Sequence, residues 1–182
     1  MAADGPGDGE LDKALLRKSA AGDSSAFHEL VDRHADRLFA LAMSLLRNNA
    51  DAEDVVQETL TGAYRGLKQF EARASVKTWL TRILILQVAK FRRDRRGKST
   101  QPIEQDAATT AGGDSATEQR LDLHAALAKL SAEHQEVLVL REFEQLSYEE
   151  MAETLGVPRG TVESRLHRAR AELREKLKVY RN

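Results

Sequence analysis

The sequence predicts an all-α protein with two small helical domains joined by a flexible linker, the second domain carrying a helix-turn-helix. Three observations support this prediction. Apolar residues recur at the three- and four-residue spacing of helices, while strand-like alternation is almost absent. A segment with almost nothing to bury, residues 98–117, interrupts the periodicity. Near the C-terminal end, a short helix, a glycine-containing turn and a second helix follow one another.

The first domain, residues 1–97, is expected to contain a short leading helix and three longer helices. The predicted helices cover residues 10–21, 25–47, 51–67 and 76–96. Asn49 or Asp51 is predicted as the N-cap of the second long helix, whose first turn holds further acids that suit the helix dipole. Ser75 is predicted to cap the next helix, in which an apolar half is followed by a basic half.

The linker, residues 98–117, is rich in Ser, Thr, Gly, Ala and Gln, and this composition is typical of a flexible segment. The second domain, residues 118–182, restores the helical period. Its predicted helices cover residues 118–130, 132–143, 147–155 and 159–178. The chain is therefore interpreted as two helical domains on a tether.

The stretch "LSYEEMAETLGVPRGTVESRLHRARAEL", residues 146–173, predicts the helix-turn-helix. Ser147 and Glu150 have the spacing of a capping box, and Gly156 can adopt the left-handed conformation that ends a helix. Pro158 suits the start of the second helix. The pattern also fits a helical hairpin with a solvated basic face. Small residues at the start of the second helix, together with its arginines, favour a DNA reader.

Charge is strongly segregated although the formal net charge is only -1. The segment "DAEDVVQETL", residues 51–60, holds four acids and no base, whereas residues 82–98 hold seven bases and one acid. Such segregation matters because a partner senses the local potential within about 8–10 Å. The excess of positive charge over residues 82–98 favours contact with phosphate.

The sequence offers nothing typical of an enzyme, a metal site or a cofactor site. It has no cysteine, its five histidines are scattered, and it shows no glycine-rich phosphate loop. The N-terminus lacks the basic and apolar regions of a signal peptide, and the longest apolar run, residues 83–86, is far below the roughly 18 residues of a membrane span. We expect a cytoplasmic protein without catalytic residues, cofactor or membrane insertion.

Three motifs together resemble a bacterial sigma factor of the extracytoplasmic-function (ECF) branch. They are "DAEDVVQETLTGAYRGLKQFE" from residue 51, "TWLTRI" from residue 78, and the helix-turn-helix stretch from residue 146. The likeness covers about residues 23–178, in order. It implies that the acidic helix docks on the clamp helices of the RNA polymerase beta-prime subunit. The matching residues are Asp51, Glu53, Asp54, Gln57 and Glu58.

The same resemblance implies two DNA-binding surfaces. The third long helix and the loop before it, residues 71–78, would engage the minus-ten promoter element and hold the non-template strand open. The residues assigned to this role are Arg73, Ser75, Lys77, Trp79, Arg82, Lys90, Arg92 and Arg93. Trp79 could instead simply fill the core. The helix-turn-helix would read the minus-thirty-five element through Arg159, Thr161, Glu163, Ser164, Arg165, His167 and Arg168.

The implied partners are core RNA polymerase, through its beta-prime and beta subunits, promoter DNA and an anti-sigma factor. The chain departs from the family pattern at two positions. Leu86 stands where the family often has Asn, and Glu163 stands where it often has Lys or Arg. A carboxylate at position 163 repels phosphate but can accept a hydrogen bond from cytosine N4.

Two other classes of function compete with this interpretation. An autonomous helix-turn-helix regulator would account for residues 118–180 but leaves the acidic helix without a role. A helical adaptor that binds only protein leaves the outward-facing arginines unexplained. Binding of residues 1–97 to RNA polymerase would separate the sigma-factor interpretation from the regulator.

Overall fold

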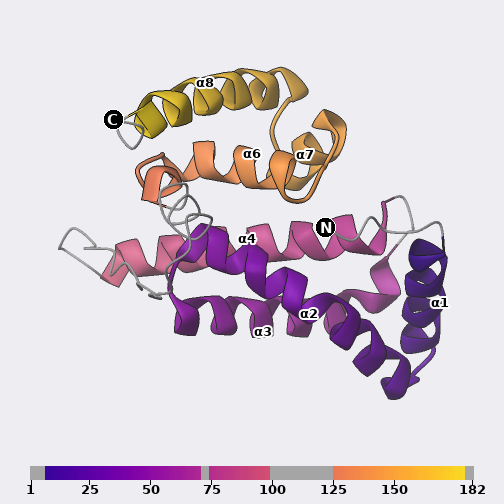
Figure 1. Ribbon diagram of the computed structural model, residues 1–182. Coiled ribbons are helices and arrows are strands. Elements are labelled where there is room, and N and C mark those ends of the chain that lie inside the picture. The colour runs from indigo at the N-terminus through magenta and orange to yellow at the C-terminus, as the bar shows by residue number, and fades with distance from the viewer. Residues whose placement is uncertain (1–6, 71–73, 99–124, 179–182) are drawn as a thin grey trace, which may run out of the picture. The chain divides into compact units, whose positions relative to one another are not determined.

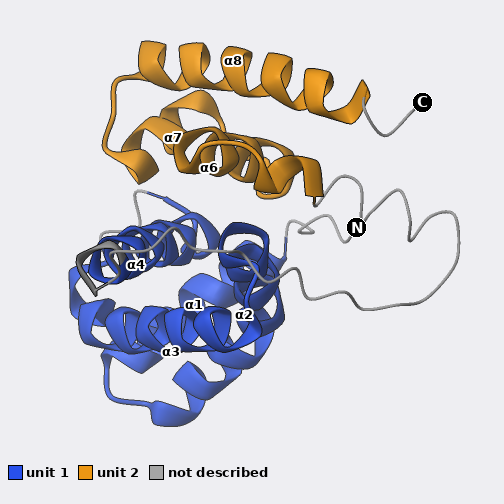
Figure 2. Ribbon diagram, turned by 90° about the vertical axis from the view of Figure 1, so that its left-hand side faces the viewer, with its two compact units in different colours: residues 1–104 blue, residues 105–182 orange. Residues whose placement is uncertain are grey.

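The computed structural model describes residues 7–70, 74–98 and 125–178, and all regular structure in these ranges is helical. The chain divides into two compact units, residues 1–104 and 105–182 (Figure 2). The prediction of an all-α chain with two helical units is therefore confirmed. Apart from Lys98, where a helix ends, the predicted linker lies outside the described residues. The predicted domain boundaries, at residues 97 and 118, stay predictions.

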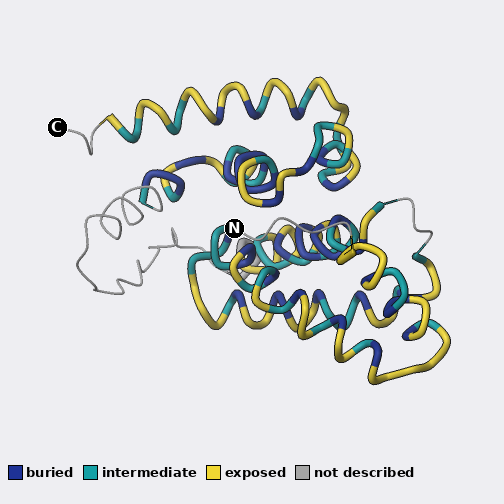
Figure 3. Tube along the Cα trace, turned by 45° about the vertical axis from the view of Figure 1, so that its right-hand side comes forward, coloured by how far each residue is buried: buried dark blue, intermediate teal, exposed yellow. Residues whose placement is uncertain are grey.

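The described residues of the first unit form a bundle of four helices and one short 3-10 helix (Figure 1). The elements are α1 (Asp8–Ala20), α2 (Ser24–Leu46), α3 (Asn49–Gly66), η1 (Leu67–Gln69) and α4 (Val76–Lys98). Helices α2, α3 and α4 pack on one another, and α1 lies against α2, α4 and η1. Each helix buries one side and exposes the other, as Figure 3 shows. The centre of the core contains Leu38, Leu84 and Val88, none of which is measurably exposed.

The caps of these helices test the predictions made from single residues. Ser75 caps α4 as predicted, since its Oγ accepts a hydrogen bond from the Thr78 N–H at 3.0 Å. The predicted cap of α3 was wrong. The N-cap is Asn48, whose Oδ1 accepts from the Asp51 N–H at 3.0 Å. Asn48 has the extended backbone that an N-cap requires, whereas Asn49 is already the first helical residue.

A buried polar cluster fastens α1 to α2. The carboxylate of Asp12 accepts one hydrogen bond from Arg33 Nε at 2.8 Å and faces His34 Nε2 at 2.8 Å. Asp12 and His34 are both buried. Burial lowers the pKa of His34, with further lowering from Arg37 and Arg33, and the Asp12 carboxylate opposes this only in part. The native fold thus favours the neutral imidazole.

This cluster predicts that acid weakens the first unit. Because the folded-state pKa of His34 lies below its unfolded value, the unfolded chain binds more protons as the pH falls. The contribution of neutral His34 to the free energy of unfolding is complete above about pH 6.5. It is lost as the pH falls toward and through the folded-state pKa. We expect the urea midpoint to drop between pH 7.5 and 5.5, and to drop less in His34→Gln. An equal drop in His34→Gln would show that His34 does not control this dependence.

Among the residues described in the second unit, three helices pack on one another: α6 (Ala132–Glu142), α7 (Tyr148–Leu155) and α8 (Arg159–Lys178). Residues 125–128 add a helical turn before α6, and the rest of the helix predicted at 118–130 lies largely outside the described residues. Met151, Val162, Leu166 and Ala169 are buried, so α7 and α8 each turn an apolar face inward. Ala152, Leu155 and Leu173 are half-buried.

The helix-turn-helix has the local geometry that the sequence predicts. Ser147 Oγ accepts from the Glu150 N–H at 3.2 Å, and the Glu150 carboxylate accepts from the Ser147 N–H at 2.9 Å. Gly156 ends α7 with a φ of 66°, which favours glycine because it has no Cβ. Pro158 precedes α8, and its carbonyl accepts from the Thr161 N–H at 2.9 Å. In the described part of the chain, no helix is long and apolar enough to cross a bilayer.

Candidate nucleic-acid and protein interfaces

Helix α3 displays the five residues predicted to bind polymerase, and it does so on two sides. Glu53, Asp54, Gln57 and Glu58 are exposed. Asp51 is half-buried and forms an ion pair with Arg95 on α4. Sequence reasoning did not foresee this pair, because its members lie 44 positions apart.

A shallow depression lies between α3 and α4, on the side of α3 that carries Asp54 and Glu58. Asp54 and Glu58 border it from α3, and Lys90 and Asp94 border it from α4. Phe91 supplies apolar surface there. Asp54 and Glu58 are four residues apart and therefore share a face of the helix. The depression thus combines acids with a basic side chain.

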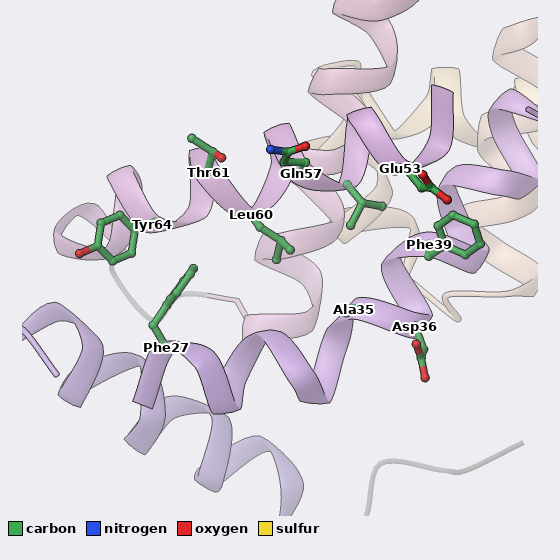
Figure 4. A pocket seen from close by; sticks show the side chains of 10 residues that line it. Phe27, Ala35, Asp36, Phe39, Glu53, Gln57, Leu60, Thr61 and Tyr64 are labelled. Carbon is green, nitrogen blue, oxygen red and sulfur yellow. The ribbon is translucent and has the colours of Figure 1, made fainter. Parts of the chain in front are cut away.

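An apolar groove runs along the other side of α3, between α3 and α2 (Figure 4). Its volume is about 560 Å³. The lining residues are Phe27, Ala35, Asp36, Phe39, Glu53, Val56, Gln57, Leu60, Thr61 and Tyr64. The rings of Phe27 and Tyr64 pack edge to face, with their centroids 5.0 Å apart, yet Tyr64 remains 56% exposed. Exposed aromatic surface next to charged rims is typical of a protein-binding site.

The groove was not predicted from the sequence, although a signal was present. Gln57, Leu60 and Tyr64 recur at the three- and four-residue spacing of one helical face. The structure leaves Leu60 half-buried and Tyr64 exposed, beside Glu53 and Gln57. Two of the residues predicted to bind polymerase, Glu53 and Gln57, therefore line the groove.

The basic residues of α4 differ in their availability to DNA. Arg82, Lys90 and Arg93 are exposed. Arg92 is half-buried and donates from Nη2 to the carbonyl oxygen of Leu45 at 2.9 Å. This carbonyl lies in the last turn of α2, where carbonyls lack helical partners, so Arg92 serves to join α4 to α2. Arg73, which was also assigned to the minus-ten surface, lies outside the described residues.

Trp79 lies near the start of α4 and is half-buried. Its ring packs against that of Phe70, with the centroids 5.1 Å apart, and a Cβ at Gly66 would meet the indole at 3.5 Å. Ser75 is exposed and Lys77 is half-buried in the same region. Packing therefore fixes Trp79 while leaving part of its ring at the surface. This geometry is compatible with both predicted roles.

Leu86 marks the first departure from the family pattern, and the structure leaves it 57% exposed on α4. The neighbouring Gln87 is half-buried and borders the depression between α3 and α4. A large apolar side chain is thus presented where a polar side chain is common in the family. Gln87 does not occupy the same face, because successive residues of a helix are about 100° apart.

Helix α8 carries the seven residues predicted to read the minus-thirty-five element. Five of them, Arg159, Glu163, Ser164, His167 and Arg168, are exposed, and Thr161 and Arg165 are half-buried. The structure therefore brings all seven together on one helix. Their electrostatic states differ, because several arginines are paired with acids of the same unit.

Three arginines of α8 form ion pairs within the second unit. Arg165 lies 3.2 Å from Glu133, and Arg170 lies 2.7 Å from Glu142. Arg159 pairs with Glu163, one turn further along α8, and with Glu149 on α7. The hydrogen bond to Glu163 and the nearby charge of Glu149 raise the pKa of Arg159.

Arg168 differs from these three. Its side chain is exposed and forms no ion pair with the residues that the structure describes. A guanidinium without an internal partner keeps all five donors for an external acceptor. Arg168 therefore offers all of its donors at the surface of α8.

Within residues 7–70, 74–98 and 125–178, no group of three or more His, Asp or Glu side chains is arranged to hold a metal ion. The buried His34 is occupied by Asp12, and His134 lies 2.8 Å from Glu172. These two imidazoles therefore serve contacts between helices.

Comparison with known proteins places both units in the same family. Residues 30–98 match the model of sigma-70 region 2, and residues 120–173 match that of sigma-70 region 4. The ECF RNA polymerase sigma factor SigE of Mycolicibacterium smegmatis is 40% identical over 172 residues, which covers 87% of this chain and 65% of that protein. The ECF RNA polymerase sigma factor SigM of Mycobacterium tuberculosis (strain H37Rv) is 35% identical, covering 89% of this chain and 82% of SigM.

Solved structures agree with this placement. The sigma factor RpoE from Bartonella quintana, solved with the anti-sigma factor NepR, is 32% identical with a TM-score of 0.71, covering 84% of this chain and 97% of that one. CnrH, solved with the cytosolic domain of CnrY, is 29% identical with a TM-score of 0.70, covering 93% and 98%. The two matched regions and the nearly full-length likeness to SigM establish that this chain belongs to the ECF RNA polymerase sigma factors.

Proposed function

We propose that the chain directs core RNA polymerase to a set of promoters from within the cytoplasm and acts there as a non-enzymatic initiation subunit. The observation that carries the proposal is the distribution of charge over the two matched regions. Exposed acids gather on α3, whereas exposed bases gather on α4 and α8. The first surface suits a basic protein partner, and the other two suit phosphate.

Polymerase docking is assigned to α3 and the groove beside it. Asp54 and Glu58 offer exposed carboxylates, and Gln57 borders the apolar groove that Leu60 and Tyr64 extend. A helix of the beta-prime clamp with both basic and apolar side chains would contact both parts of this surface. The apolar part would supply affinity, and the charged part would supply orientation and rate of encounter.

Promoter opening is assigned to α4 and the segment before it. Arg82, Lys90 and Arg93 are exposed and available to phosphates. The partly exposed face of Trp79 can stack with an unpaired base, as aromatic side chains do in single-strand binding. Arg92 is assigned a positioning role, because its contact with Leu45 holds α4 against α2.

Recognition of the minus-thirty-five element is assigned to α8, the second helix of the helix-turn-helix. Arg168 is proposed as a direct reader because it is exposed and carries no ion pair within the described residues. Arg165 and Arg170 would exchange their exposed partners Glu133 and Glu142 for phosphates. Among the residues that the structure describes, each of these arginines has a single surface ion pair, which contributes only about 0.2–1 kcal/mol, so one phosphate can replace the acid.

Control by an anti-sigma factor is proposed from the two solved relatives. RpoE was solved with the anti-sigma factor NepR, and CnrH was solved with the cytosolic domain of CnrY. In this chain, the groove between α2 and α3 offers an apolar seat for a partner helix, next to the acids assigned to polymerase. A partner in this groove would exclude the clamp and keep the sigma factor inactive.

The proposed function is tested by transcription in vitro with purified core polymerase on fragmented genomic DNA, followed by mapping of the transcript starts. We expect discrete starts that appear only when the chain is added and that share one pair of upstream elements. An autonomous regulator would behave differently. It would bind promoter DNA alone and stimulate only polymerase that already carries another sigma factor, and that outcome would refute the proposal.

A further inference from the structure

Arg159 occupies an unusual position at the start of the recognition helix, because two carboxylates and one aromatic ring surround it. Its Nε donates to Glu163 Oε1 at 2.8 Å, and its Nη1 donates to Glu149 Oε1. The guanidinium carbon lies 5.9 Å from the centre of the Tyr148 ring. Glu149 and Tyr148 belong to α7, so the arrangement links the two helices of the helix-turn-helix.

This arrangement determines which donors of Arg159 remain for a ligand. A guanidinium has five N–H donors, and the two acids use the Nε donor and one of the two on Nη1. The two donors on Nη2 and the second on Nη1 remain. Two of these three donors can serve the two acceptors of guanine, O6 and N7, in the major groove.

Fixing the side chain also favours recognition of a base over a phosphate. An unsupported surface arginine has several rotamers and must give up more of this freedom to hold one orientation toward a base. An arginine held by acids on two helices loses less rotamer freedom on binding and approaches the groove in one orientation. The two carboxylates also repel phosphate, so they discourage the nonspecific alternative.

We propose that Arg159 reads a guanine in the minus-thirty-five element and that Glu163 and Glu149 are positioning residues that act through it. The proposal rests on the function assigned above to α8. It gives the Glu163 carboxylate a role within the protein, in place of direct hydrogen bonding to cytosine. The second departure from the family pattern, an acid at position 163, is thus explained by a basic residue four positions before it.

The test uses holoenzyme made from the full chain and core polymerase, with a promoter library randomised in the minus-thirty-five element. Transcripts are sequenced to obtain the base preference at each position. The variants are Glu163→Gln, Glu149→Gln, Arg159→Ala and the two double variants that combine each glutamine with Arg159→Ala. Glu153→Gln is the matched control, because Glu153 is an exposed acid of α7 outside the cluster.

We expect Arg159→Ala to abolish a guanine preference at one base pair, where a bidentate contact gives about five- to 150-fold discrimination. Glu163→Gln and Glu149→Gln should each reduce the preference at that same base pair by about threefold or more, because Arg159 is then held less firmly in the orientation that contacts the base. Each double variant should have the same base-preference profile as Arg159→Ala alone. Glu153→Gln should match the unmodified chain.

Three results would overturn the proposal. The first is a profile that Arg159→Ala leaves unchanged. The second is a loss of cytosine preference in Glu163→Gln that persists in the Arg159→Ala background, because Glu163 would then read the base itself. The third is no effect of Glu149→Gln. Arg168→Ala is included to test α8 separately: if it too leaves the profile unchanged, the recognition role of α8 fails, and not only the role of the cluster.

Discussion

Replacing both Asp54 and Glu58 with lysine is expected to weaken binding to core RNA polymerase by about tenfold or more, because like charges placed opposite each other across an interface cost several kcal/mol. Both side chains are exposed and share one face of α3. They border the depression to which Lys90 already contributes a positive charge, so two added lysines would reverse the local potential. The fold should persist, because neither side chain belongs to the core.

The measurement is competition with an unmodified, labelled chain for core polymerase, together with circular dichroism to establish that helicity is unchanged. The matched control is Glu29→Lys with Asp32→Lys, which alters the net charge equally on exposed positions of α2. We expect the control to bind within about twofold of the unmodified chain, as surface charges outside an interface act weakly at physiological salt. Equal affinity of the α3 variant and the control would refute the assignment of α3 to polymerase.

The fold could be predicted largely from local signals, because most of its elements depend on neighbours within one helical turn. The capping box of Ser147 and Glu150, the left-handed Gly156 and the Ser75 cap all join residues three or four positions apart or act on a single backbone angle. The Asn48 cap was missed by one position. Asn48 and Asn49 are chemically identical, and only the backbone angles decide which of them leads the helix.

The candidate sites were less predictable, since they depend on contacts between distant segments. The Asp51–Arg95 pair spans 44 positions, and the bond from Arg92 to Leu45 spans 47. A single sequence contains no signal for such pairings. The groove beside α3 was missed for a related reason. Apolar periodicity shows that Leu60 belongs to an apolar face, but the packing of α2 determines how much of that face is covered.

The motif resemblance assigned roles to α3, α4 and α8, but it could not predict which ion-pair partner each side chain has. It assigned Arg159, Arg165 and Arg168 to one surface, and the structure distinguishes them by their partners. Arg165 is balanced by Glu133, whereas Arg159 is held by two acids. Each of these acids comes from a different part of the second unit. The difference between a held arginine and an available one is therefore a property of tertiary structure.

Arg168→Ala is expected to cost about 1–3 kcal/mol of binding to a matched promoter and to relax base preference at one position of the minus-thirty-five element. The side chain is exposed on α8 and forms no ion pair with the described residues, so its loss leaves no internal partner unsatisfied. The control is Arg174→Ala, which removes an exposed arginine from the same helix.

Two measurements separate the possible roles of Arg168. Promoter binding by holoenzyme over a series of salt concentrations gives the number of phosphate contacts, and library selection gives the base preference. A pure phosphate contact would lower affinity evenly across sequences and reduce the salt slope by about one, with the preference intact. We expect the opposite, a position-specific loss with little change in slope, because the end of a freely donating arginine fits the paired acceptors of guanine better than a single phosphate oxygen. Uniform weakening across the library would assign Arg168 to the DNA backbone and leave base reading to other residues of α8.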